Sequence, residues 1–587
     1  MFRKKMHSPG GSHTHGLINP GPRWAKPPHI SGPLGDISLE SASSAPGMIY
    51  ILPVLLMIGV TEKELHPIDF ISFLGLSGIW DTKTKGGESM KRAMVIGCAV
   101  FCLVLVYTST GTAGTADKMG SGKVSAKSGD VNWELFGNLK VYPHLVDNVD
   151  FNDDQTKYDF FQDEDGSHGN EESIRTEARI GFNALGQNWT FFSILEADFV
   201  YNKVNTDRGA GDALGIDDSG MTGEDFGIEK LEATYDFAAH GMPIKLATGW
   251  NDKFADIATG GMVYGDDHPF IELSGEIMRD VKWNALYLVI LDDIDESLDG
   301  DGEVSAYDAD DLDWRAYSLK LQFPLGDTGL NVSPFYFYSD NEGHKADVHY
   351  FGLEAIGKAG IFTPRAEFVY VTGEKDDHEL GNGNIDDVDI ESYAAFASLE
   401  ADIHPLFKPF VGGYFYQGDG DANDGDIDAY NAITNIARYA PVFGMENAFI
   451  YRHIPVLGTH IYSNTPSMLG GSGTGYGGLS NSDSANSPGM ISLGIGAKGS
   501  RNNWEYKAMM QYFEFEDTGA LEDLEGKSID DEMGMEFDVQ LTYHFTDHFS
   551  LGNTLSVFDP GDGIQDLYGS DYDETAIMNT FEMIWRF

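Results

Sequence analysis

Charged residues recur at every second position in several stretches of this 587-residue chain, and their types and spacing could do chemistry. Apolar residues stand between them, so each stretch has one charged and one apolar face, as a β-strand has. Opposite charges lining a water-filled passage would create a transverse field that acts on permeating solutes. An equally weighted alternative is that these charges pair and only neutralise a wall. The candidates are Arg175, Glu177, Arg179, Lys230, Glu232, Arg365, Glu367, Glu505, Lys507, Glu536 and Asp538.

Calcium binding is a second chemistry that the sequence offers, in two acidic loops. The first loop follows EF-hand spacing imperfectly, because it begins with Ser297 and has Asp308 at the twelfth position in place of Glu. Its candidate metal ligands are Asp299, Asp301 and Asp308. The second loop contains Asp419, Asp421, Asn423, Asp424, Asp426 and Asp428. More often, Asp/Gly loops of this kind are simply solvated, so Ca²⁺ is a secondary expectation and we expect no other cofactor.

Motifs of known catalytic chemistry are absent from the sequence. It contains no HExxH, no phosphate-binding P-loop and no GxSxG. Its Ser and His residues form no defined nucleophile–base pair. We therefore expect no catalytic residues and no enzyme. The net charge of −55 also argues against a nucleic-acid partner.

The last ten residues, 578–587, give the clearest indication of the elements that position these charges. Thr580, Glu582, Ile584 and Arg586 alternate with a bulky apolar set. Large aromatics on one face suit a strand that meets lipid at the membrane interface. An amphipathic strand in a soluble sandwich is the alternative. The expected lipid-facing residues, which we also interpret as a membrane-insertion signal, are Phe581, Met583, Trp585 and Phe587.

A secretory signal peptide is predicted inside the chain, over residues 90–116. Met90-Lys91-Arg92 is basic, Ala93 to Tyr107 is apolar, and small residues follow. Because Lys85-Gly86-Gly87-Glu88 can be encoded by a ribosome-binding type of sequence, translation is expected to begin at Met90. Residues 1–89 are then an upstream leader or a disordered extension. Both cysteines lie within the signal peptide, so no disulfide is expected after cleavage.

The remaining chain predicts a short periplasmic segment, 117–130, followed by an all-β transmembrane antiparallel barrel, 131–587. No later apolar run approaches the roughly 20 residues of a membrane helix. Alternating segments of about ten residues number about 18, with 16 as the alternative. Very short connections at 186–188, 240–242, 326–328, 358–360 and 546–548 are typical of periplasmic hairpins. Long acidic connections are typical of extracellular loops, and 424–488 is either such a loop or a segment folded into the pore.

In these features residues 131–587 resemble Gram-negative outer-membrane porins, and the strand count resembles the alginate-export type of barrel. The resemblance implies an outer-membrane location, lipid and lipopolysaccharide as neighbours, insertion by the barrel-assembly machinery, and a monomer or trimer. It implies diffusion of small hydrophilic solutes or ions. The strongly acidic composition favours cations and departs from a polyanion exporter.

Three alternatives remain open at this point. One is an export or uptake channel for a polysaccharide or another specific substrate. Another is a secreted, acidic, calcium-dependent adhesin or binding protein, which would be soluble without detergent. The last is a barrel that anchors surface structures without transporting anything.

Overall fold

The computed structural model describes residues 124–148, 151, 171–200, 226–254, 258–259, 261–291, 313–430, 432–435, 444–445, 448–450 and 488–587. The expected leader (1–89), the signal peptide (90–116) and the first acidic loop with Asp299, Asp301 and Asp308 lie outside these residues. Within the described part, no helix combines the length and apolarity needed to cross a bilayer.

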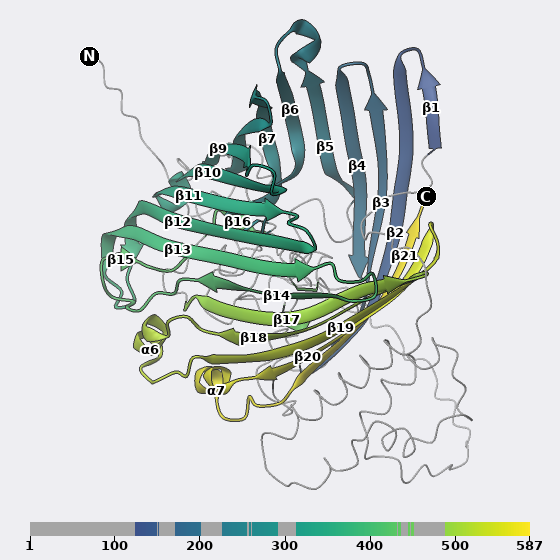
Figure 1. Ribbon diagram of the computed structural model, residues 1–587. Coiled ribbons are helices and arrows are strands. Elements are labelled where there is room, and N and C mark those ends of the chain that lie inside the picture. Colours follow the sequence, from purple (N-terminus) through teal and green to yellow (C-terminus); the bar gives the residue numbers. More distant parts are fainter. Residues whose placement is uncertain are drawn as a thin grey trace, which may run out of the picture. The chain divides into compact units, whose positions relative to one another are not determined.

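The fold is a closed antiparallel β-barrel, whose described residues form 18 wall strands (Figure 1). Each wall strand pairs with the next one along the chain, and the last, β21, pairs with the first, β2. The predicted fold class, an all-β antiparallel barrel of about 18 strands, is therefore confirmed.

The wall strands agree with the segments that the sequence predicts, with ends that differ by a few residues. The first nine are β2 (Val131–Asp147), β3 (Glu171–Leu185), β4 (Trp189–Val200), β5 (Phe226–Asp236), β6 (Ile244–Phe254), β7 (Tyr264–Met278), β8 (Val281–Leu291), β9 (Trp314–Pro324) and β10 (Leu330–Asn341). The other nine are β11 (Ala346–Gly357), β12 (Phe362–Glu379), β13 (Ile385–Ala401), β14 (Lys408–Tyr416), β17 (Met490–Arg501), β18 (Trp504–Glu514), β19 (Glu532–Thr546), β20 (Phe549–Pro560) and β21 (Ala576–Arg586).

Small elements complete the described part of the chain. β15 (Asp426–Ile427) and β16 (Thr434–Asn435) are two-residue strands that pair in parallel with β13 and β7. The 3₁₀ helices η2 (Phe237–His240) and η4 (Glu342–His344) and the α-helices α6 (Gly519–Glu525) and α7 (Asp562–Tyr568) lie in connections. β1 (Val124–Ser128) forms a hairpin with β2, where the sequence predicts a periplasmic segment without a strand.

The connections alternate in the expected way. All five short turns predicted from the sequence join consecutive strands at one end of the barrel, which we call the short-turn end. At the opposite, long-loop end, β14 and β17 are separated by residues 417–489. Two connections there are nevertheless short: η4 joins β10 to β11, and 380–384 joins β12 to β13.

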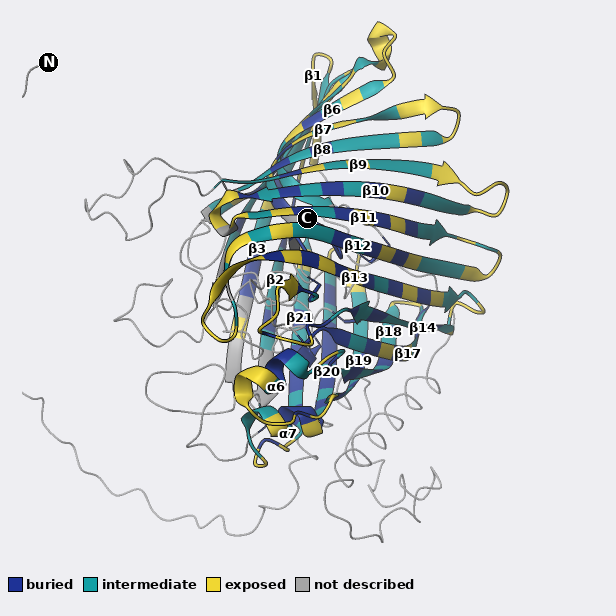
Figure 2. Ribbon diagram, turned by 90° about the vertical axis from the view of Figure 1, so that its left-hand side faces the viewer, coloured by how far each residue is buried: buried dark blue, intermediate teal, exposed yellow. Residues whose placement is uncertain are grey.

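The residues that alternate along the strand sequences also alternate in burial in the barrel wall. Along β10 to β13, buried and exposed residues alternate (Figure 2). The exposed side carries Phe351 and Leu353, each 49% exposed, whereas their neighbours Tyr350 and Glu354 are buried. Cross-strand partners share a face, so this inside–outside division continues around the barrel.

Candidate channel interior

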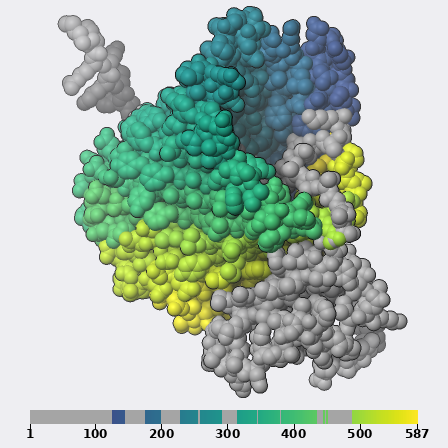
Figure 3. Space-filling view, in the orientation of Figure 1, coloured from purple at the N-terminus to yellow at the C-terminus, as the bar shows by residue number. Residues whose placement is uncertain are grey.

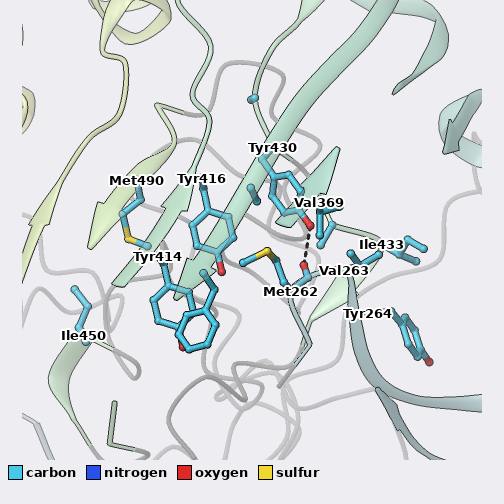
Figure 4. Packing of buried hydrophobic residues seen from close by; sticks show 14 of the residues in the cluster. Met262, Val263, Tyr264, Val369, Tyr414, Tyr416, Tyr430, Ile433, Ile450 and Met490 are labelled. Atoms are coloured by element: carbon cyan, nitrogen blue, oxygen red, sulfur yellow. Dashed lines mark hydrogen bonds between the residues drawn. The ribbon is translucent and has the colours of Figure 1, made fainter. Parts of the chain in front are cut away.

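Two connections from the long-loop end fold into the barrel, and we call their described residues the in-folded segments. One lies between β6 and β7 and comprises Ala258, Thr259 and 261–263; the other lies between β14 and β17 and comprises 429–430, 432–435, 444–445 and 448–450. They meet inside the barrel, where the Tyr430 hydroxyl donates to the Met262 carbonyl at 3.0 Å (Figure 4). The Ile433 N–H donates to the Val263 carbonyl at 2.9 Å. From Ala429 onwards the described part of 424–488 therefore enters the barrel, the second of the two predicted possibilities, whereas 424–428 stay at the long-loop end.

Apolar packing holds the in-folded segments against part of the wall. Met262, Tyr430 and Ile433 are almost fully buried in a cluster with inward residues such as Val369 and Tyr416 (Figure 4). These are large side chains, and burying one is worth roughly 1.5–3 kcal/mol. The cluster fills the barrel along β7 to β14 and on to β20, so this side of the interior is packed core.

Buried carboxylates on β11 and β12 anchor the first in-folded segment. Glu354 accepts a hydrogen bond from the Ala258 N–H at 3.2 Å and pairs with Lys320 at 2.5 Å. Glu367 accepts from the Thr259 hydroxyl at 3.0 Å. Both glutamates are 2–3% exposed. A buried acceptor with such partners fixes backbone geometry, because losing a partner leaves a desolvated charge.

A similar arrangement on β18 to β20 anchors the second in-folded segment. Glu536 accepts from the Ile450 N–H at 3.0 Å and from the Ser556 hydroxyl at 2.5 Å. The Phe449 N–H donates to the Ser556 hydroxyl oxygen at 2.9 Å. Lys507 donates to the Gly444 carbonyl. Asp538 is also fully buried, next to Glu536 on the inward face of β19.

The opposite side of the interior, along β2 to β7, carries a series of paired charged side chains, most of which retain 10–21% exposure, whereas Glu177 and Glu196 are buried. We call them the charged track: Lys140, Glu177, Arg179, Glu196, Glu229, Lys230, Glu232, Asp252, Lys253 and Glu272. Arg179 contacts Glu196 at 2.8 Å, Glu229 at 2.9 Å and Glu177 at 3.2 Å. Lys253 lies 3.1 Å from both Glu232 and Glu272.

A β-bulge contributes to the charged track. The pairing of β4 with β5 shifts between Ile194 and Leu195, and Glu229 is the extra residue on β5. Ile228 faces outward at 51% exposure, yet both Glu229 and Lys230 reach interior partners. Bulges re-aim side chains in this way. Strict alternation in the sequence misses Glu229 for this reason. The other track residues outside the predicted set are Lys140, Glu196, Asp252, Lys253 and Glu272.

The structure places eight of the eleven predicted pore residues in two groups and the other three elsewhere. Glu177, Arg179, Lys230 and Glu232 belong to the charged track. Glu367, Lys507 and Glu536 contact the in-folded segments, with Asp538 buried beside them. Arg365 lies on the same face of β12 as Glu367, and Glu505 lies near the short-turn end, 3.4 Å from His544. Arg175 pairs along the backbone with Tyr142 and Val200, and its side chain lies outside the description.

The second acidic loop lies at the long-loop end beside α6. Its carboxylates accept backbone N–H bonds: Asp419 from Asp421 at 3.0 Å, Asp421 from Asn423 at 2.9 Å and Asp424 from Asp426 at 3.0 Å. Burial raises the pKa of Asp419 to about 7, with Asp424 and Asp428 adding to the effect. No group of three metal-ligating side chains stands out among the described residues, so calcium in these loops stays a prediction.

The outer surface is apolar between two rows of aromatic side chains, and Figure 3 shows one face of this wall. At the short-turn end, Trp504, Tyr543, Phe545, Phe549 and Trp585 stack in series at 4.6–5.4 Å between ring centroids. Towards the long-loop end, Tyr317, Tyr338 and His349 form another series. Between the rows stand exposed aliphatic residues such as Leu493 and Ile495. Aromatic rows flanking an apolar band of about 25 Å are typical of outer-membrane barrels.

The terminal strand takes the predicted orientation. Trp585 and Phe587 face outward at 40% and 48% exposure, whereas Thr580 and Glu582 are buried on the inward face. Phe581 and Met583 alternate with Glu582 on the outward side and are half-buried. Their role as an insertion signal stays a prediction.

No model of a known protein family matches the sequence, and no curated protein matches it. Among solved structures, Acinetobacter baumannii OccAB1 is 11% identical, with a TM-score of 0.42 over 81% of this chain and 99% of that one. Pseudomonas aeruginosa OccK11 (OpdR) is 10% identical, with a TM-score of 0.39 over 77% and 95%. Pseudomonas aeruginosa OpdK, solved with vanillate, is 10% identical, with a TM-score of 0.40 over 77% and 98%.

Proposed function

We propose that this protein is a bacterial outer-membrane channel through which small hydrophilic solutes or ions diffuse, with a preference for cations. The observation that carries the proposal is the closed barrel whose charged residues face inward and whose exposed apolar band faces outward. Such a band is costly in water and favourable in lipid, which argues against a secreted soluble protein. Proteins of the outer membrane reach it through a signal peptide of the kind expected at 90–116.

The permeation path in this proposal lies off-centre, along the charged track. The in-folded segments cover Glu354, Glu367, Glu536 and their neighbours on the opposite wall. The track side chains of Arg179, Lys253 and Glu272 remain 15–19% exposed. The in-folded segments thus serve as the constriction, and the track is the wall that a solute passes.

The charge of the track supports a cation preference. It has six carboxylates, Glu177, Glu196, Glu229, Glu232, Asp252 and Glu272, against four cations, Lys140, Arg179, Lys230 and Lys253, for a formal net charge of −2. Every cation of the track lies beside a carboxylate, so none is available to attract an anion without competition. An excess of carboxylates in a narrow aqueous path raises the local concentration of cations.

Planar-bilayer recording of the refolded barrel, 117–587, tests the proposal. Stepwise conductance is expected, and a KCl gradient should give a reversal potential with the sign of potassium selectivity. Glu232→Gln together with Glu272→Gln, which are 16% and 19% exposed, should move the reversal potential towards zero. The matched control is Glu391→Gln on the outward side, where Glu391 bonds to the Tyr370 hydroxyl. Insertion without conductance would contradict the channel and favour an anchoring barrel, and an anion-selective potential would contradict the cation preference.

A further inference from the structure

The seam between β21 and β2 differs from every other pairing in the described wall. β21 pairs with residues 138–147 of β2, whereas residues 131–135 of β2 pair with β1. β1 and β21 therefore lie end to end along one edge of β2. Each other pair of wall strands is consecutive in the wall order, but β2 and β21 are its first and last strands. No connecting turn holds this pair together.

Gly137 and Phe587 pair at the position on β2 between its pairing with β1 and its pairing with β21. The Gly137 N–H donates to the Phe587 carbonyl at 3.0 Å, and the Phe587 N–H donates to the Gly137 carbonyl at 3.0 Å. The Phe587 ring lies directly over the glycine: a Cβ added to Gly137 would stand 2.3 Å from the ring Cζ atom. A side chain at position 137 would therefore displace the ring.

The Phe587 ring lies on the outward face of the wall. Gly137 is paired with Ile180, which is 47% exposed, and Phe587 is itself 48% exposed. The Phe587 side chain of β21 thus covers the bare backbone of Gly137 on the neighbouring strand, on the outward face of the seam. Aromatic coverage of a cross-strand glycine stabilises sheets because the glycine alone has no side chain to pack.

The same device recurs inside the barrel between strands that are consecutive in the chain. Aromatic rings cover glycines on the neighbouring strand in the pairs Phe136 with Gly181, Phe335 with Gly352, and Phe410 with Gly496. Short or long connections already hold those strands together. At the seam, closure must overcome the entropy of bringing distant chain segments together. The ring–glycine contact should therefore contribute more to the stability of this pairing than to that of the others.

We propose that Phe587 seated on Gly137 is the lock that closes the barrel, a role separate from recognition of Phe587 by an insertion machinery. Release of the ring would free the end of β21 to fray from β2, because the pairing beyond it belongs to β1. Fraying at a strand end costs little when side-chain packing is missing. The lock depends only on the folded barrel and not on what the channel conducts.

Refolding without any assembly machinery tests the lock. The denatured chain is refolded into detergent–lipid micelles, and the folded fraction is followed by heat-modifiable gel mobility. Phe587→Ala should lower both the folded fraction and the temperature at which the folded form is lost. The matched control is Phe545→Ala, which removes an outward aromatic of similar exposure, 51%, from the aromatic row at the short-turn end. Equal behaviour of the two variants would overturn the proposal.

A double-mutant cycle supplies the second test. Gly137→Ala adds a methyl group where the ring lies, and Phe587→Ala clears that space. The methyl group would also meet the Arg179 carbonyl oxygen at 2.6 Å, but this clash is common to both backgrounds. The loss caused by Gly137→Ala should therefore be smaller when position 587 is Ala. Additive losses would contradict the lock, and if no Gly137 variant folds, the comparison of positions 587 and 545 decides.

Discussion

Single buried carboxylates inside this barrel have structural partners that their sequence context does not reveal. Glu354, Glu367 and Glu536 stand at inward positions of alternating strands, as residues lining a lumen do. In the structure they accept hydrogen bonds from Ala258, Thr259 and Ile450. A carboxylate held by such donors positions the backbone that it binds, whereas Arg179, Lys253 and Glu272 of the charged track keep the partial exposure that a solute needs.

At the residue scale, Asp419 predicts a pH dependence of the long-loop end, outside the membrane-spanning strands. Its pKa of about 7 lies well above the value near 3.9 of an unfolded Asp, because the carboxyl is buried. The folded loop therefore keeps a proton that the unfolded loop has lost. Its stability should be greatest below about pH 4 and should fall as the pH rises to 7.

Hydrogen exchange of the amides of 419–430, corrected for the intrinsic pH dependence of exchange, measures this effect. Protection should decrease from pH 5 to pH 8 in the wild type, and Asp419→Asn should flatten the profile. Asp547→Asn, in an exposed turn at the other end of the barrel, is the control. A wild-type profile as flat as that of the Asn variant would show that Asp419 does not control the loop.

At the scale of elements, the in-folded segments are separate from the wall, and each is anchored by a few groups. Glu536→Ala removes the acceptor of the Ile450 N–H and of the Ser556 hydroxyl, which should destabilise the second in-folded segment by roughly 1–3 kcal/mol. The wall strands keep their own ladders, so the barrel should still form. Single-channel recording should then show larger or noisier conductance.

Glu505→Ala is the control for this element, because Glu505 lies inside the barrel near the short-turn end and contacts His544 instead of an in-folded segment. It should leave the noise unchanged. If Glu536→Ala also leaves conductance and noise as in the wild type, the second in-folded segment does not constrict the path.

At the scale of the whole molecule, the net charge of −55 and the acidic track predict selectivity that depends on salt. The Debye length is about 10 Å at 0.1 M salt and about 3 Å at 1 M. Cation preference should therefore weaken as KCl is raised from 0.1 M to 1 M at a constant concentration ratio across the bilayer. A reversal potential that does not change with the KCl concentration would contradict an electrostatic origin of the selectivity and would assign it to pore width.

The wall of the barrel could be read from the sequence because it depends on local physics. Alternation with period two fixes which side chains share a face, as Trp585 and Glu582 illustrate on opposite sides of β21. Short turns such as 186–188 leave no room for anything but a hairpin. The inward position of Glu229 could not be predicted from the sequence. The one extra residue of the bulge changes the face that a side chain takes, but it does not change the composition of the strand.

The sequence alone predicted an antiparallel barrel of about 18 strands, the outward aromatic faces and the two kinds of connection, since each follows from the nearest neighbours along the chain. Only the tertiary structure decided which inward charges line an open side and which hold in-folded segments. That decision depends on contacts such as Tyr430 with Met262 and Phe587 with Gly137. Residues so far apart in the chain come into contact because the wall is closed. Periodicity in the sequence describes only neighbouring residues, so it does not predict such contacts.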